Sequence, residues 1–275
     1  MPQRIGFIGA GNMAASLIGG LIADGYPSDC IQVTDINPDK IRALQQRFGI
    51  GSAAGSVAVV ETSDIVVLAV KPQQIRALAQ EIAPAVQRRR PLVVSIAAGI
   101  READLERWLG DPVPIVRTMP NTPALVQTGA TGLHANPHVD ETQRDWAESL
   151  MRAVGITIWV DREELLDAVT AVSGSGPAYF FLLMEAMEKA GTELGLGRAD
   201  ARLLVEQTAL GAAKLAMEAD AGPEELRHRV TSPGGTTEKA IEVFSRGEFT
   251  ELVRKALKAA YERAQSLSQQ LGEQE

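Results

Sequence analysis

Short runs rich in β-branched residues alternate with amphipathic helical patterns along the first 110 residues of the sequence. The runs RIGFIG, IQVTDI, DIVVLAV and PLVVSIAAG are each followed by a segment whose apolar residues have helical spacing. Strand, helix and strand in this order form βαβ units, whose strands lie parallel in one sheet. The alternation therefore predicts an α/β fold with a doubly wound, mainly parallel sheet.

A change of pattern near residue 160 predicts a second domain. The runs PIVRTMP, GATGLHA and ITIWV extend the predicted sheet, with a helix over about residues 141–154 between the last two. Beyond Asp161 almost every segment has helical spacing, interrupted by SGSGP, LGLGR, DAGPE and TSPGG. We therefore expect an α/β domain over residues 1–160 and an all-α domain over residues 161–275.

A glycine-rich turn joins the first predicted strand to the first predicted helix. In IGFIGAGNMAASL, Gly9, Gly11 and Ala14 match the pattern G-x-G-x-x-A. Gly9 permits the tight turn, Gly11 leaves room for a pyrophosphate, and Ala14 lets the helix pack closely on the strand. Free N–H groups and the helix dipole favour phosphate at that helix start. The loop predicts a Rossmann domain that binds a dinucleotide; a purely structural turn is the alternative.

Asp35 ends the next predicted strand, about twenty residues after the glycine loop. A carboxylate there hydrogen-bonds both adenosine ribose hydroxyls of NAD and repels the 2′-phosphate of NADP, which favours NAD. Thr34, Asn37 and Lys40 can nevertheless accommodate a phosphate if Asp35 turns away. Asp35 can also be read as a turn residue ahead of the segment NPDK.

Three later loops complete the predicted cofactor site. LAVKP, SIAAG and RTMPNTPA each follow a predicted strand, and the carboxyl ends of strands face the ligand crevice in such sheets. The two prolines of MPNTP hold Asn121 and Thr122 in a fixed backbone, which suits a nicotinamide pocket, whereas Lys71 alone reads as a solvated lysine. The predicted cofactor-binding residues are Gly9, Ala10, Gly11, Asn12, Met13, Asp35, Ser56, Ala69, Val70, Lys71, Pro72, Ala97, Met119 and Asn121.

The composition of the chain limits the kinds of partner and site that it can have. The net charge of -8 argues against a general nucleic-acid binder. The single cysteine, Cys30, excludes an internal disulfide and a cysteine metal cluster, and it reads as a small buried hydrophobe. No leader pattern or apolar run of about 18 residues is present, so we expect a soluble cytoplasmic protein that does not bind membranes.

The histidines and tryptophans carry no site pattern. His134, His138 and His228 lack a paired metal spacing, so we expect no metal and interpret them as solvated or turn residues. The tryptophans are interpreted as core or interface anchors. They are Trp108, Trp146 and Trp159.

Six stretches resemble one enzyme family in order and spacing. They are IGFIGAGNMA, AVKP, VSIAAG, RTMPNTPA, VSGSGPAY and TSPGGTT, and together they resemble pyrroline-5-carboxylate reductases over essentially the whole chain. The last two are far more specific than the glycine loop. The resemblance implies a Rossmann domain followed by an interlocking dimerisation domain, a homodimer or a ring of dimers. It also implies that NADPH or NADH reduces L-1-pyrroline-5-carboxylate to L-proline, the final step of proline biosynthesis.

The loop TSPGGTT, directly before the helical segment EKAIEVF, fits that substrate. The substrate is a small ring with one carboxylate and one imine. We expect the amides of Gly235, Thr236 and Thr237 to lie at the helix start, where the dipole favours a carboxylate. Gly234 and Gly235 leave room for the ligand, and Ser232 adds a hydroxyl. An ordinary helix entry is the alternative.

The resemblance implies that Thr237 contacts the ring nitrogen of the substrate, because the matching residue of the family does so. We therefore expect Thr237 to be the catalytic residue, acting by position. A threonine hydroxyl is a poor proton source, so the proton is expected from solution or bound water. A further hypothesis is that Arg229 meets a cofactor phosphate in a neighbouring subunit.

VSGSGPAY interrupts a helix predicted to begin near Asp161. Glycines and Pro177 destabilise a helix interior, so a plain packing helix would not carry them. We expect their small size to let cofactor and substrate approach, with Ser173 and Ser175 on the cleft side as substrate-binding residues. A tight helix crossing in a dimer is the competing explanation.

Two other functions compete with imine reduction. A β-hydroxyacid dehydrogenase of the 6-phosphogluconate type has the same domain order but uses a lysine on the long helix, and no lysine or arginine occurs from Glu163 to Glu188. Imine reduction needs no such base. A non-catalytic dinucleotide sensor would keep the glycine loop but has no reason to keep the carboxylate loop at residues 231–237.

Overall fold

The computed structural model describes residues 2–273, and the chain forms two compact units. The α/β unit comprises the residues up to Ser175 together with those from Ala260 onward, and the helical unit is Gly176–Ala259. The sequence pattern placed the domain boundary after residue 160, where the last strand of the sheet ends. None of the described helices has the length and apolar character needed to cross a membrane.

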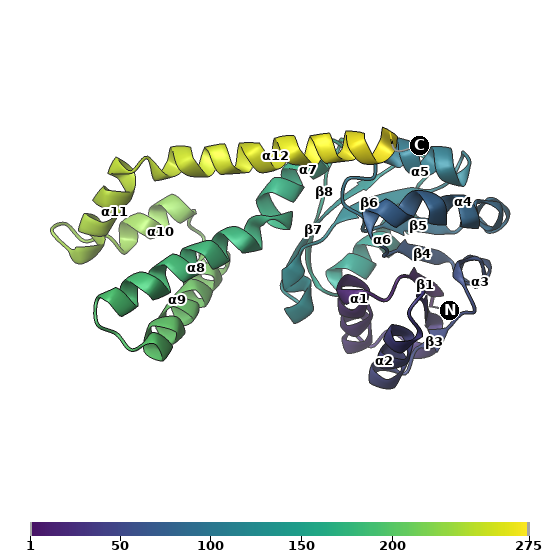
Figure 1. Ribbon diagram of the computed structural model, residues 1–275, viewed down its shortest axis with the longest axis horizontal. Helices are drawn as coiled ribbons and strands as arrows, with labels where there is room; N and C mark the ends of the chain where they lie inside the picture. The colour runs from purple at the N-terminus through teal and green to yellow at the C-terminus, as the bar shows by residue number, and fades with distance from the viewer. Residues whose placement is uncertain (1, 274–275) are drawn as a thin grey trace. The chain divides into compact units, whose positions relative to one another are not determined.

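One sheet of eight strands forms the centre of the α/β unit (Figure 1). Its order is β3-β2-β1-β4-β5-β6-β7-β8, and only the β6–β7 pair is antiparallel. The predicted mainly parallel, doubly wound sheet is therefore confirmed. Three of its inner strands, β1, β4 and β5, are wholly buried, which explains their continuous apolar sequences. The strands are Ile5–Ile8, Ile31–Thr34, Gly51–Ser52, Ile65–Leu68, Leu92–Ser95, Ile115–Met119, Gly129–Ala135 and Gly155–Trp159.

Helices cover both faces of this sheet. Helices α1, α2 and α6 lie on one face and α3, α4 and α5 on the other (Figure 1). Side chains of the first three contribute to one hydrophobic core cluster, and those of the other three to a second. The short elements α3 and β3 and the 3-10 turns η1 (Ser28–Cys30) and η2 (Thr122–Val126) were not predicted. The six helices are Asn12–Ala23, Pro38–Phe48, Ser56–Thr62, Pro72–Arg89, Glu102–Leu109 and Glu141–Arg152.

The last helix, α12 (Phe249–Glu273), begins in the helical unit and ends in the α/β unit. Its side chains at Ala264, Ser268 and Leu271 are buried and recur at helical spacing, so they form one face. Leu271 belongs to the same core cluster as α4 and α5, and Arg107 donates to the Gly272 carbonyl at 3.0 Å. The end of α12 is therefore a structural part of the α/β unit.

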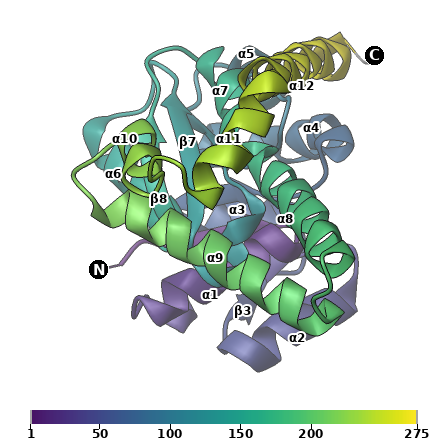
Figure 2. The ribbon, with the colours of Figure 1, turned by 90° about the vertical axis from the view of Figure 1, so that its left-hand side faces the viewer.

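The helical unit is all α, as predicted. Helices α8 and α9 pack against each other and are joined by a short turn (Figure 2). Large apolar side chains remain uncovered in one chain: Phe180 is 64% exposed, Leu203 66% and Leu210 62%. Such an apolar surface marks an interface. Besides α12, its helices are Gly176–Glu193, Arg198–Glu218, Pro223–Arg229 and Thr236–Arg246.

A buried network of charges corrects one sequence interpretation. His134 lies on β7 with its Nδ1 2.7 Å from Glu102 Oε1, and its side chain is only 16% exposed, so it is neither solvated nor in a turn. Glu163 Oε1 accepts bonds from the Glu102 amide and from Arg117, both at 2.8 Å. Among the tryptophans, Trp108 lies in the core as predicted. Cys30 is half-buried rather than buried.

The network predicts a pH-dependent contribution to stability. Burial raises the pKa of the Glu102 carboxyl, and the hydrogen bond with His134 opposes that rise only in part. Because the folded protein holds the Glu102 proton more tightly than the unfolded chain, this contribution is present below the unfolded pKa and lost as pH rises through the folded pKa. Glu102→Gln keeps an acceptor for His134 without the charge. We expect the wild type to lose stability relative to this variant as pH rises from the ordinary glutamate pKa of about 4.5 toward neutrality.

Thermal unfolding of both proteins across that range measures the difference. Glu81→Gln, an exposed position on α4, serves as the control. A constant difference between wild type and Glu102→Gln would contradict the assignment.

Candidate active site

The ends of five neighbouring strands bring the predicted cofactor residues to one edge of the sheet. Gly9–Met13 follow β1, Asp35 follows β2, and Ala69–Pro72 follow β4. Ala97 follows β5, and Met119 and Asn121 lie at the end of β6. The strand order reverses at β1, which lies between β2 and β4. Dinucleotides bind at such a reversal in doubly wound sheets.

The glycine loop has the geometry of a phosphate site. Gly9 has φ +107°, and a Cβ there would stand 2.5 Å from the Ala69 carbonyl oxygen. A Cβ on Gly11 would meet open space, and Ala14 is fully buried against the sheet. Among the described residues, the amides of Gly11, Asn12 and Met13 have no acceptor. They lie at the N-terminus of the 12-residue helix α1, where an anion is favoured.

The Asp35 carboxylate hydrogen-bonds to the glycine loop itself. Its Oδ2 accepts from the Ala10 amide at 2.7 Å, and its Oδ1 accepts from the Asn37 amide at 2.8 Å. The carboxylate therefore ties the glycine loop to the end of β2. Each oxygen keeps a second lone pair for a ribose hydroxyl. The preference for NAD over NADP stays a prediction.

Asn121 connects three segments of the α/β unit. It is 8% exposed; its side-chain oxygen accepts from the Ala130 amide at 2.9 Å, and its nitrogen donates to the Ser173 carbonyl at 3.0 Å. The side chain thus joins the loop after β6 to β7 and to the helical segment at residue 173. A contact between Asn121 and the nicotinamide stays a prediction. Ser56 begins α3, shortly after β3.

The stretch VSGSGPAY spans the end of a π-helix (Thr170–Gly174), which follows α7 (Leu165–Val169), and the first turn of α8. The Ser175 amide donates to the Thr170 carbonyl at 2.8 Å, and the Ser173 hydroxyl donates to the Val169 carbonyl at 3.0 Å. A Cβ on Gly174 would stand 2.6 Å from the Met119 methyl carbon, so the glycine lets the predicted nicotinamide residue pack on the helix. Such π-bulges occur frequently at functional sites. Substrate contacts of Ser173 and Ser175 stay predictions.

The predicted carboxylate loop lies in the helical unit, immediately before α11. The Gly235 amide donates to the Ser232 carbonyl at 3.0 Å, which corrects the expectation that it is free. The amides of Thr236 and Thr237 have no acceptor among the described residues. Both threonines are exposed, as are Ser232 and Gly234. The Glu238 amide also has no acceptor among the described residues, so three unpaired donors remain at the positive end of the 11-residue helix.

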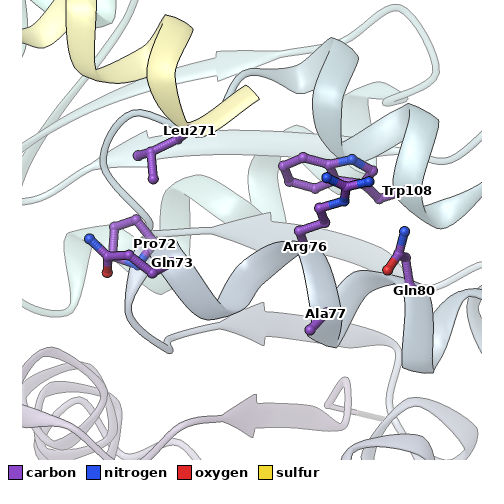
Figure 3. A pocket seen from close by; sticks show the side chains of 7 residues that line it. All are labelled: Pro72, Gln73, Arg76, Ala77, Gln80, Trp108 and Leu271. Atoms are coloured by element: carbon purple, nitrogen blue, oxygen red, sulfur yellow. The ribbon is translucent and has the colours of Figure 1, made fainter. Parts of the chain in front are cut away.

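A surface hollow of about 340 Å³ lies apart from most of these residues (Figure 3). Its walls come from α4, from Trp108 on α5 and from Leu271 at the end of α12. Pro72 is the one predicted cofactor residue that lines it. The hollow is therefore distinct from the dinucleotide site predicted by the glycine loop.

Three possible metal ligands meet at the opposite edge of the sheet. Ligand atoms of Glu106, Asp111 and His138 lie within 4.8 Å of one another. The Glu106 carboxylate already accepts from Asn136 at 2.6 Å, and His138 pairs with Asp111 at 3.2 Å on exposed side chains. Their sequence spacing gives no sign of this grouping. The expectation of no metal stays a prediction.

Two family models match the chain. One, described as pyrroline-5-carboxylate reductase dimerisation, matches residues 163–267. The other, described as NADP oxidoreductase, coenzyme F420-dependent, matches residues 4–99. The matched ranges fall on the helical segment and on the first part of the sheet.

Full-length relatives are similar over nearly all of the chain. A curated pyrroline-5-carboxylate reductase of Pseudomonas aeruginosa is 53% identical over 270 residues, covering 98% of each chain. A protein of the same name from Escherichia coli is 40% identical over 272 residues, covering 98% of this chain and 99% of its own.

Two solved structures are also similar. A pyrroline-5-carboxylate reductase of Coxiella burnetii has a TM-score of 0.93 at 47% identity, covering 96% of this chain and 98% of its own. A Plasmodium falciparum pyrroline carboxylate reductase with NADP bound has a TM-score of 0.85 at 27% identity, covering 97% of this chain and 98% of its own.

Proposed function

Because the chain belongs to the pyrroline-5-carboxylate reductase family, we propose that its glycine loop and its Ser232–Thr237 loop bind cofactor and substrate respectively. The enzyme reduces L-1-pyrroline-5-carboxylate to L-proline with NADPH or NADH, the final step of proline biosynthesis. One observation carries the substrate assignment: two adjacent unpaired amides at an exposed helix start can receive the two oxygens of one carboxylate.

The residues of the glycine loop fit a dinucleotide. Gly9 allows the loop to lie against the end of β4, and Gly11 leaves open space over the start of α1. The amides of Gly11, Asn12 and Met13 would bind the pyrophosphate. Asp35 would face the adenosine ribose while holding the loop in place. The bound dinucleotide supplies the hydride.

The protein then contributes to the reaction by positioning the substrate. The Thr236 and Thr237 amides hold the substrate carboxylate, and the Thr237 hydroxyl hydrogen-bonds the ring nitrogen. Fixing both ends of a small ring sets which carbon faces the hydride donor. A protonated imine accepts hydride without a protein base. The nitrogen's proton comes from solvent, because a threonine hydroxyl is too weak an acid.

Gly235→Val tests the substrate loop. A Cβ on Gly235 would stand 3.0 Å from the Ser232 carbonyl oxygen, so the larger side chain both displaces the turn and fills the approach of the carboxylate. We expect KM for pyrroline-5-carboxylate to rise at least about tenfold, with the Kd of the dinucleotide unchanged. Steady-state assays of cofactor oxidation and a binding titration measure both.

Gly222→Val is the matched control. Gly222 is also the N-cap of a helix, but a Cβ there meets open space. An unaltered KM in Gly235→Val would remove the loop from the substrate site.

The helical unit belongs to the family's dimerisation domain, so the chain has the means to oligomerise. We propose a homodimer that buries the exposed side chains of Phe180, Leu203 and Leu210, and a ring built from such dimers. The support is the large apolar area that one chain leaves uncovered. Sedimentation equilibrium tests this assembly; a monomer at micromolar concentration would contradict it.

A further inference from the structure

Four successive amides lead into α11, and the protein uses only the first two. The Gly234 amide donates to Glu238 Oε2 at 2.8 Å, and the Gly235 amide donates to the Ser232 carbonyl at 3.0 Å. Those of Thr236 and Thr237 have no acceptor among the described residues. The loop therefore offers a ligand the adjacent Thr236 and Thr237 amides, followed by the Glu238 amide, which also has no acceptor among the described residues.

The Glu238 side chain accepts the first of these hydrogen bonds. It occupies the third position of α11, where a glutamate ordinarily reaches back to the amide of the N-cap residue. Here the N-cap is Gly235, which has no side chain, and its amide is already taken by Ser232. The carboxylate instead reaches one residue further, to Gly234.

Gly234 needs such support because its backbone is left-handed, with φ +73°. A Cβ there would meet open space, so no packed neighbour within 4 Å of that position braces it. Glycine also retains more freedom than other residues when nothing constrains it. The bond to Glu238 is thus the side-chain contact that fixes the turn from Ser232 to the helix.

We propose that Glu238 is a positioning residue for the substrate carboxylate, holding the loop so that the Thr236 and Thr237 amides point to one ligand. This inference rests on the proposed role of the loop. Glu238 touches neither substrate nor cofactor. By holding the loop in one conformation before the substrate arrives, it reduces the conformational entropy that is lost on binding.

Two substitutions separate this role from a general loss of structure. Glu238→Ala removes the acceptor, whereas Glu238→Gln keeps an amide oxygen able to receive the Gly234 amide. For Glu238→Ala we expect KM for pyrroline-5-carboxylate to rise about tenfold, with kcat changed by less than about twofold and the dinucleotide Kd unchanged. For Glu238→Gln we expect KM within about threefold of the wild type.

Hydrogen exchange provides a readout that does not depend on turnover. The Gly234 amide should exchange faster in Glu238→Ala than in the wild type and recover its protection in Glu238→Gln. Glu242→Ala is the matched control, because Glu242 lies one turn further along α11 and, among the described residues, its carboxylate pairs with Lys239 and Arg246 alone. It should leave KM and Gly234 exchange unchanged.

Two results would overturn the inference: an unaltered KM in Glu238→Ala, or a Glu238→Gln enzyme as impaired as Glu238→Ala. If Gly235→Val raises KM while Glu238→Ala does not, only the role of Glu238 fails. If neither variant alters KM, the loop itself is not the carboxylate site.

Discussion

Replacing Thr237 by alanine is expected to lower turnover by roughly ten- to a hundredfold while dinucleotide affinity stays unchanged. The amide of residue 237 survives this change, so the carboxylate keeps both of its donors. What disappears is the hydroxyl that orients the ring nitrogen. The effect should therefore fall on kcat more than on KM.

Thr237→Ser separates the effect of losing the hydroxyl from any effect of the substitution on the start of the helix. Serine restores the hydroxyl, and it is well tolerated near a helix N-terminus. We expect it to recover most of the turnover lost in Thr237→Ala, as measured by cofactor oxidation at saturating substrate. Equal turnover of the alanine variant and the wild type would exclude Thr237 from the reaction.

Gly9→Ala and Gly11→Val should separate folding from cofactor binding. At Gly9 the φ of +107° and the 2.5 Å approach to the Ala69 carbonyl oppose any side chain. The neighbour is backbone, so it cannot rotate away. We expect Gly9→Ala to lower the free energy of unfolding by roughly 3 kcal/mol or more and to abolish dinucleotide binding.

At Gly11 the φ of -77° suits any residue, and a Cβ meets open space. Gly11→Val should therefore change the free energy of unfolding by less than about 1 kcal/mol. Its side chain nevertheless occupies the approach of the pyrophosphate, so the dinucleotide Kd should rise about a hundredfold. Denaturant unfolding and fluorescence titration measure the two quantities. Tight binding by Gly11→Val would contradict the proposed phosphate site.

The sheet, and the edge of it at which the predicted cofactor residues lie, were predictable because local patterns determine them. Ile65–Leu68 and Leu92–Ser95 are continuous apolar runs bounded by turn residues, and parallel strands buried on both faces require such runs. Gly9 and Gly11 are diagnostic because they stand between a strand and a helix. By contrast, the two-residue strand β3 and the seven-residue helix α3 are too short to show a period.

Such local patterns could not predict contacts between residues far apart in the sequence. Helical spacing shows that Leu271 lies on an apolar face, but it does not show which element covers that face. Asn121 was expected to face a ligand, and only the structure reveals the two backbone groups that hold its amide. Glu238 was missed, although a glutamate shortly after a helix start is a recognisable capping signal.

The route of α12 has a consequence for how this protein is made. Leu271 completes the core beside α4 and α5, yet it follows them in the chain only after the whole helical unit. The nascent α/β unit must wait on the ribosome, with that core open, while the intervening helices emerge. Its folding can finish only after the helical unit and the end of α12 have left the exit tunnel.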